Sequence, residues 1–90
     1  MKIQKCASAG TMESCDVYVE IEPNETGLEI LLESIVLNRF EGSIRQVIGE
    51  VLKEFQIESG SLRIMDRGAL ECVLRARLET AILRGKEENQ

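Results

Sequence analysis

The chain has 90 residues, of which 43% are apolar and only 3% aromatic, and its formal net charge at pH 7 is -5. A chain of this length forms a single small domain over residues 1–90, whose aliphatic core leaves little room for a deep ligand pocket. An acidic surface repels phosphate backbones, so we expect no binding of nucleic acid.

The cysteines and the absent histidine narrow the chemistry further. Without histidine, the Ser-His-Asp triad, the Cys-His pair and the HExxH zinc site are excluded. Cys6, Cys15 and Cys72 form no CxxC pair, which argues against a structural metal site. We expect them to be reduced thiols packed in the core of a cytoplasmic protein.

The chain shows no feature of a membrane or secreted protein. No stretch approaches the roughly 20 apolar residues of a membrane span. The amino terminus also lacks the apolar region of a secretion signal. We therefore expect no membrane contact and a cytoplasmic location.

A strand is predicted over residues 16–22, where apolar and polar side chains alternate strictly. If the alternation continues backwards without a bulge, Cys15 points into the core and Ser14 points to solvent. Ser14 would then be an exposed hydroxyl between two carboxylates, those of Glu13 and Asp16.

Turn chemistry follows over residues 23–27, which contain Pro, Asn and Gly. Residues 28–33 alternate again and are predicted to form the second arm of a hairpin with residues 16–22. Residues 2–9 are predicted as an earlier strand on a weaker pattern.

The period then changes to that of a helix. Asn38 and Glu41 resemble a capping box at its start. Gly49 lies inside the helix, either to allow close approach to the sheet or because it is simply tolerated. The predicted apolar stripe comprises Phe40, Ile44, Val47, Ile48, Val51, Leu52 and Phe55.

The last part of the chain predicts a turn at Ser59, a short strand over residues 62–65 and a second helix over residues 68–84. Asp66 is the predicted N-cap and Gly85 the predicted stop, with a flexible tail over residues 85–90. The apolar face of this helix should comprise Leu70, Val73, Leu74, Leu78, Ala81 and Ile82.

These elements predict an α+β fold in which a small, mostly antiparallel sheet of three to four strands is covered on one face by two helices. That arrangement buries both amphipathic stripes against one sheet. No repeat or linker divides the chain.

Charged side chains offer two readings. The arginines of the carboxy-terminal part could bind a phosphorylated group or an acidic partner, but pairing with neighbours such as Glu71 and Glu79 is favoured. Glu13 and Asp16 are interpreted as solvated charges rather than as acid catalysts. The arginines concerned are Arg63, Arg67, Arg75 and Arg77. The residues alone thus predict a non-catalytic domain with one exposed serine.

Two blocks of sequence resemble one known family. Residues 9–17 (AGTMESCDV) are similar to the amino-terminal motif of the citrate lyase acyl carrier proteins, the gamma chains of a bacterial enzyme complex. Residues 67–79 (RGALECVLRARLE) resemble the carboxy-terminal helix of the same family. Cys15 is a departure, because Gly or Ser is common at that place.

The resemblance implies that Ser14 carries 2'-(5''-triphosphoribosyl)-3'-dephospho-CoA through a covalent phosphodiester bond. The thiol of this prosthetic group would hold acetyl or citryl while partner subunits convert citrate to acetate and oxaloacetate. The implied partners are the alpha (acyltransferase) and beta (lyase) subunits, the prosthetic-group transferase and the citrate lyase ligase. The chain itself would be a carrier and not an enzyme, and its acidic flanks around Ser14 could steer docking onto basic partner surfaces.

Two alternatives remain open at this point. The first is the corresponding carrier subunit of malonate decarboxylase, which uses the same kind of prosthetic group. The second is a protein-interaction module in which Ser14 stays unmodified.

Overall fold

The computed structural model describes residues 3–35 and 37–86, with the backbone alone for residues 37–41. Three strands are followed by a helix, a fourth strand and a second helix along this part of the chain. In chain order they are β1 (Ala7–Gly10), β2 (Val17–Glu22), β3 (Leu28–Ser34), α1 (Leu37–Glu54), β4 (Gly60–Asp66) and α2 (Glu71–Lys86).

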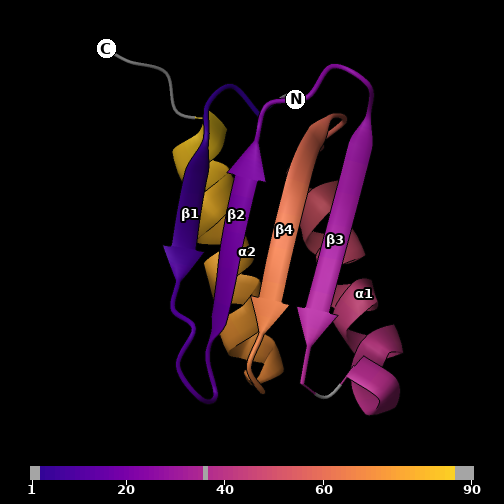
Figure 1. The fold of residues 1–90 in the computed structure, drawn as a ribbon. Helices are drawn as coiled ribbons and strands as arrows, with labels where there is room; N and C mark the ends of the chain where they lie inside the picture. The colour runs from indigo at the N-terminus through magenta and orange to yellow at the C-terminus, as the bar shows by residue number, and fades with distance from the viewer. Residues whose placement is uncertain (1–2, 36, 87–90) are drawn as a thin grey trace.

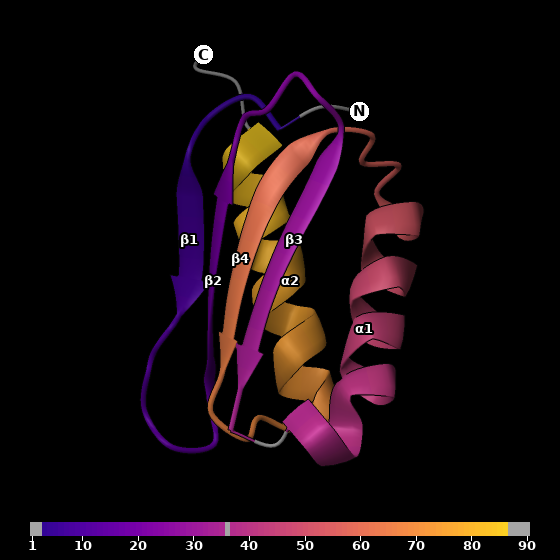
Figure 2. The same ribbon diagram turned by 45° about the vertical axis from the view of Figure 1, so that its right-hand side comes forward.

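The strands form one sheet in the order β1-β2-β4-β3, and both helices lie on the same face of it (Figures 1 and 2). The pairs β1–β2 and β2–β4 are antiparallel, whereas β3–β4 is parallel. The predicted fold class, an α+β domain with a mostly antiparallel sheet covered on one face, is confirmed.

The predicted hairpin between β2 and β3 is wrong. β4 lies between them, with Val19 opposite Ile64 on one side and Leu32 opposite Ile64 on the other. β3 instead connects through α1 to its parallel neighbour β4, as parallel strands require a crossover. The turn chemistry of residues 23–27 is real, but it joins strands that are not adjacent.

The core fills the space between the sheet and the helices. The alternation of β2 is confirmed, because Val17, Val19 and Ile21 are fully buried. From β4, Leu62 and Ile64 face the same side. The remaining members of the cluster are Ile3, Ala9, Leu32, Ile44, Val47, Ile48, Val51, Leu52, Ile57, Leu74, Leu78, Ala81 and Ile82.

The stripe of α1 is confirmed for its described side chains, but two details differ. The helix begins at Leu37, one residue before the predicted cap, and the side chains of the Asn38–Glu41 box lie outside the described residues. Gly49 is exposed, and a Cβ there would meet nothing within 4 Å. Close approach to the sheet is therefore not the reason for this glycine.

α2 starts three residues later than predicted and continues through the expected stop. Gly85 is a buried contact: a Cβ there would lie 2.5 Å from Cδ1 of Ile21. Its carbonyl also accepts hydrogen bonds from the amides of Gln4 and Lys5, both at 2.9 Å. A close approach between helix and strand therefore replaces the predicted tail at residues 85 and 86, while residues 87–90 lie outside the described residues.

Two predictions about burial fail. Leu70, placed on the apolar face of α2, precedes the helix and is 70% exposed. Cys6, Cys15 and Cys72 are free and exposed rather than packed in the core. Neither helix in the described part of the chain combines the length and apolar character needed to cross a bilayer.

Candidate functional site

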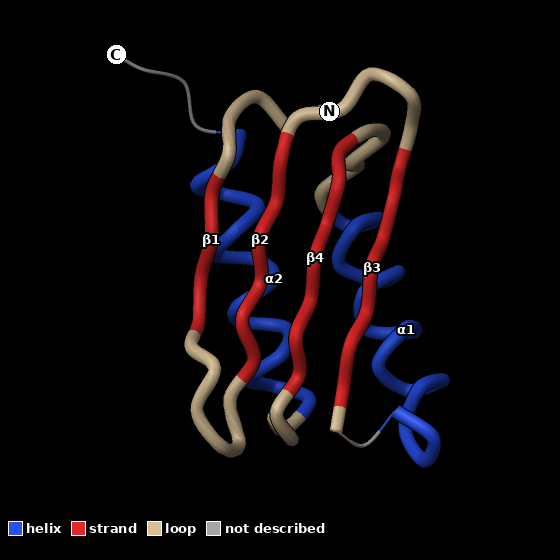
Figure 3. The backbone as a smooth tube through the Cα atoms, viewed as in Figure 1, coloured by secondary structure: helices blue, strands red, loops and turns tan. Residues whose placement is uncertain are grey.

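The candidate site lies at one end of the sheet, in the connection between β1 and β2. Figure 3 shows this connection beside the one that leads from β4 to α2, and Figure 2 shows the same neighbourhood from another side. Residues 11–16 make up the first connection, called here the Ser14 loop, and residues 67–70 make up the second.

Ser14 sits at the corner of a tight turn. The amide of Asp16 donates a hydrogen bond of 3.1 Å to the carbonyl of Glu13, so Ser14 and Cys15 occupy the two central positions. Ser14 is exposed, as predicted. Its hydroxyl makes no hydrogen bond to any residue that the structure describes. The turn therefore presents a free nucleophile to solvent.

The predicted inward direction of Cys15 is wrong, and the reason is local. β2 begins only at Val17, and Cys15 has a φ of 66°, so the strand alternation does not extend to it. A positive φ at the third position is typical of a type II turn, where glycine is the favoured residue. This backbone explains why a glycine would suit the place that Cys15 occupies.

Gly10 makes the loop geometrically possible where β1 ends. Its φ is 93°, and a Cβ there would lie 1.8 Å from the carbonyl oxygen of Val17. No other residue tolerates that approach without a shift of the backbone.

Asp16 holds the Ser14 loop together. Its carboxylate accepts hydrogen bonds from the hydroxyl of Thr11 and the amide of Val17, both at 2.7 Å. Nε and a terminal nitrogen of Arg77 donate to its two oxygens, both at 3.1 Å. The Thr11 hydrogen bond, followed by the Arg77 and Val17 hydrogen bonds, lowers the pKa of Asp16 to about 2. Asp16 is thus an ionised structural group and not a proton donor.

These contacts change the interpretation of Glu13 and Asp16, which the sequence predicted to be two solvated charges beside Ser14. The charge of Asp16 is compensated by Arg77, and its side chain is only 15% exposed. Glu13 is exposed. An acidic surface for docking would therefore depend on Glu13 rather than on both residues.

The Ser14 loop is also tied to the connection between β4 and α2. The amide of Cys15 donates to the carbonyl of Arg67 at 2.8 Å, and the amide of Arg67 donates to the carbonyl of Asp16 at 2.9 Å. These two backbone bonds extend the β2–β4 pairing past the end of β4, so the turn that carries Ser14 is braced from the neighbouring segment.

Asp66 organises the second connection, although not as the predicted N-cap. Its carboxylate accepts from the amide of Ala69 at 3.0 Å and from the hydroxyl of Ser34 at 2.7 Å. Since α2 starts only at Glu71, this bond closes a turn that precedes the helix. The residue is buried, so its two hydrogen bonds satisfy a group that would otherwise be costly to bury.

Four arginines are candidates from the sequence, which favours their pairing with neighbours such as Glu71 and Glu79. Three of them instead pair with carboxylates on other elements. Arg77 binds Asp16 as described. The other pairs are Arg63 with Glu20 at 3.3 Å, and Arg75 with Glu50 at 2.5 Å and with Glu54 at 3.6 Å. The side chain of the fourth, Arg67, is exposed and contacts no charged or hydrogen-bonding group of the described residues.

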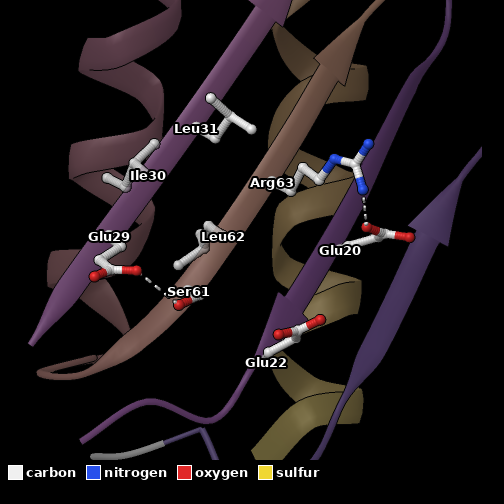
Figure 4. Close-up of a pocket in the computed structure, with 8 residues that line it drawn as sticks. All are labelled: Glu20, Glu22, Glu29, Ile30, Leu31, Ser61, Leu62 and Arg63. Atoms are coloured by element: carbon white, nitrogen blue, oxygen red, sulfur yellow. Dashed lines mark hydrogen bonds and ion pairs between the residues drawn. The ribbon is translucent and has the colours of Figure 1, made fainter. Parts of the chain in front are cut away.

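Other features offer little chemistry. A hollow of about 270 Å³ lies over β2, β4 and β3, toward the end of β2 far from Ser14 (Figure 4). Two pairs of lining side chains bond to each other, Arg63 to Glu20 and Ser61 to Glu29, both at 3.3 Å. Within residues 3–35 and 37–86, no group of three metal-binding side chains gathers.

Comparison with known proteins agrees with this picture of a small non-catalytic domain. Residues 4–85 match the family of acyl carrier proteins described as the malonate decarboxylase delta subunit. A solved structure, of a Pseudomonas malonate decarboxylase hetero-tetramer in complex with malonate, contains a chain with the same fold. The TM-score is 0.82 at 25% identity, over 93% of this chain and 87% of that one. The class is therefore that of small acyl carriers.

Relatives of higher identity define the family more narrowly. The citrate lyase acyl carrier protein of Enterobacter sp. (strain 638) is 47% identical over 98% of this chain and 91% of its own length. The protein of the same name from Latilactobacillus sakei is 45% identical over 94% of this chain and 84% of its own. The chain belongs to the family of citrate lyase acyl carrier proteins, as its resemblance implied.

Proposed function

We propose that the chain is the acyl carrier subunit of a bacterial citrate lyase and that Ser14 anchors its prosthetic group. One observation carries the assignment of the residue. Ser14 has an exposed hydroxyl with no hydrogen-bond partner among the described residues, at the corner of a turn that is braced from two directions. Such a group is accessible to a modifying enzyme and remains in a defined place after modification.

The donor implied is 2'-(5''-triphosphoribosyl)-3'-dephospho-CoA, which would leave its phosphoribosyl-dephospho-CoA part attached to Oγ of Ser14 through a phosphodiester. When bound, it supplies a thiol that forms thioesters with acetyl and citryl. The residues present fit such a group, because the hydroxyl is free and the exposed side chain of Arg67 lies on the adjoining segment. Gly10 and Asp16 keep the anchor in place while the arm moves.

The surroundings of Ser14 favour a carrier over a catalyst. The chain contains no histidine. Hydrogen bonds from Thr11 and Arg77 lower the pKa of Asp16 to about 2, so this neighbouring carboxylate is a poor base for activating the hydroxyl. A tethered acyl group instead reaches separate active sites at high effective concentration.

The partners proposed are the acyltransferase and lyase subunits, alpha and beta, together with the prosthetic-group transferase and the citrate lyase ligase. The hetero-tetrameric assembly of the Pseudomonas relative supports a multi-subunit setting. A complex that cleaves citrate with CoA chemistry belongs in the cytoplasm, and that is the location we propose.

The direct test is the intact mass of the protein purified from a host that makes the prosthetic group. We expect an adduct on the wild type and none on Ser14→Ala. Ser43→Ala is the matched control, because Ser43 is an exposed serine on α1 and should leave the adduct unchanged. A wild type without an adduct would favour an interaction module with unmodified Ser14.

A carrier subunit of malonate decarboxylase is the second candidate, favoured by the family match and by the solved relative. The two are separated by reconstitution of the loaded carrier with purified subunits of each enzyme. Formation of a citryl thioester from citrate, followed by mass spectrometry, supports citrate lyase. Formation of a malonyl thioester alone would reverse the assignment.

A further inference from the structure

Two turns meet at the end of the sheet, and each presents one side chain at its corner. Ser14 follows Glu13 in the turn closed by Asp16. Arg67 follows Asp66 in the turn closed by the amide of Ala69, where Gly68 has a φ of 90°. The hydrogen bonds at 2.8 and 2.9 Å between residues 15–16 and 67 hold the two turns side by side.

The guanidinium of Arg67 differs from those of nearby arginines because it forms no hydrogen bond or ion pair with the described residues. The carboxylates of Glu20, Glu50 and Asp16 engage Arg63, Arg75 and Arg77, and Arg84 donates to the carbonyl of Ser8 at 2.8 Å. Arg67 is exposed, and no contact of its guanidinium is found with the residues described. An arginine without a hydrogen bond or ion pair among the described residues has its full hydrogen-bonding capacity available for a ligand.

The charges of the Ser14 loop explain why a guanidinium able to donate hydrogen bonds would be useful there. Because Arg77 already compensates Asp16, the exposed carboxylate of Glu13 is the uncompensated charge of the Ser14 loop. A phosphate ester on Ser14 would add a second negative charge next to Glu13. A guanidinium that reaches this phosphate would oppose the repulsion and could bind the phosphate oxygens through two parallel hydrogen bonds.

We infer that Arg67 binds the phosphate that joins the prosthetic group to Ser14, and that it positions the same phosphate during attachment. The inference rests on the proposed function. It assigns to Arg67 a role as a positioning residue for a phosphodiester, with the guanidinium donating to the non-bridging oxygens. The backbone of Arg67 braces the anchor while its side chain holds the ligand.

Attachment from a triphosphate donor gives the inference a kinetic consequence. Oγ of Ser14 loses its proton to the transferase or to water and bonds to the phosphorus nearest the ribose. The bond from that phosphorus to the outer two phosphates breaks, and inorganic pyrophosphate leaves. Arg67 is placed to offset the charge that this phosphorus brings to the loop.

The experiment compares rates of attachment for wild type, Arg67→Gln, Arg67→Lys and Arg63→Gln, using purified transferase, its triphosphate donor and intact mass. We expect Arg67→Gln to lower kcat/KM about ten- to a hundredfold, the size of one or two charge-assisted hydrogen bonds. Arg67→Lys should recover part of the loss. Arg63→Gln is the control, since Arg63 is exposed and lies on the sheet away from Ser14.

A second readout separates phosphate binding from docking of the transferase. The modified proteins are examined by phosphorus NMR of the diester and by nitrogen NMR of the Arg67 guanidinium. We expect the diester resonance to differ between modified wild type and modified Arg67→Gln. We also expect the Arg67 Nε–H signal of the wild type to move on modification.

Identical diester resonances and an unmoved Arg67 signal would overturn the inference, even if Arg67→Gln is modified slowly. An unmodified wild type would instead contradict the proposed function, so the two failures are distinguishable. A folding defect of Arg67→Gln is not expected to account for slow modification. The side chain of Arg67 has no hydrogen bond or ion pair to lose within the described residues, and circular dichroism of each variant checks that it folds.

Discussion

The connections at the two ends of β2 are built from similar residues but are held in different ways. Residues 11–16 and 23–27 both contain a side chain that accepts a backbone amide two residues on, Thr11 in one and Asn24 in the other. The Ser14 loop is additionally fixed by a bidentate ion pair to a residue 61 positions away. Residues 23–27 are fixed by neutral hydrogen bonds to themselves and to the start of β4.

This difference indicates that the Ser14 loop is held more rigidly than residues 23–27. Under the proposed function Ser14 anchors an arm that moves between active sites, which requires a fixed base, and the Ser14 loop has a long-range bidentate ion pair where the described bonds of residues 23–27 are neutral. Bidentate arginine–carboxylate pairs define geometry as well as energy. Residues 23–27 need only carry the chain from β2 across to the edge strand β3.

The largest expected effect comes from glycine substitutions in the two regions. Gly10→Ala would place a Cβ 1.8 Å from the Val17 carbonyl at a φ of 93°. We expect a loss of about 3–4 kcal/mol in the free energy of unfolding. Gly27→Ala also meets a positive φ, of 116°, but nothing lies within 4 Å of its Cβ. Its loss should be about 1–2 kcal/mol.

Urea denaturation of both variants provides the measurement. Equal losses would mean that the carbonyl contact at Gly10 is relieved at no cost and that the Ser14 loop is no more constrained than residues 23–27. Ser8→Ala, on the same strand as Gly10, should change stability little and controls for substitution in β1.

These two regions also show what could be predicted from the sequence. Exposure of Ser14 followed from strand parity, and it is correct, but the parity argument stops at Val17 because Cys15 turns the chain at positive φ. The period of the strands and helices depends on side chains close in sequence, so the elements were predictable. The place of β4 between β2 and β3 depends on contacts distant in sequence, which turn residues do not encode.

The contacts that hold the Ser14 loop were harder to predict, because they too join residues distant in sequence. Arg77 was noted as one of four arginines, but its partner is Asp16 rather than a neighbour on α2. That pairing depends on α2 lying against β1 and β2 with its amino-terminal end toward the Ser14 loop. Arg67 stands out only when the partners of the other three are known.

The next effect in size is the loss of the ion pair that braces the Ser14 loop. Asp16→Asn and Arg77→Gln should each lower the thermal midpoint and accelerate hydrogen exchange of the Cys15 and Arg67 amides, which bridge the two connections. A double variant should lose less than the sum of the single ones, because both remove one interaction. Strict additivity would contradict a direct pair.

Lowering the pH of the wild type should remove the stabilisation that the Asp16–Arg77 ion pair provides. The pKa of Asp16 is lowered from 3.8 to about 2 in the folded protein. The ionised form is therefore favoured by folding, and its contribution to stability is complete above about pH 5 and lost as the pH falls toward 2. The stability difference between wild type and Asp16→Asn should shrink over that interval. A carbon NMR titration of the Asp16 carboxyl that gave an ordinary pKa would contradict the pairing.

The smallest effect is expected from Asn24→Ala in the opposite connection. Oδ1 of Asn24 accepts from the amide and the hydroxyl of Thr26, both at 2.6 Å, and Nδ2 donates to Ser61 at 2.9 Å. These neutral, mostly exposed bonds should contribute about 1 kcal/mol in total. Asn24→Asp keeps the acceptor and should lose less. Exchange of the Cys15 and Arg67 amides should not change in either variant. Faster exchange there would mean that the two ends of β2 are coupled and that the Ser14 loop is not braced independently.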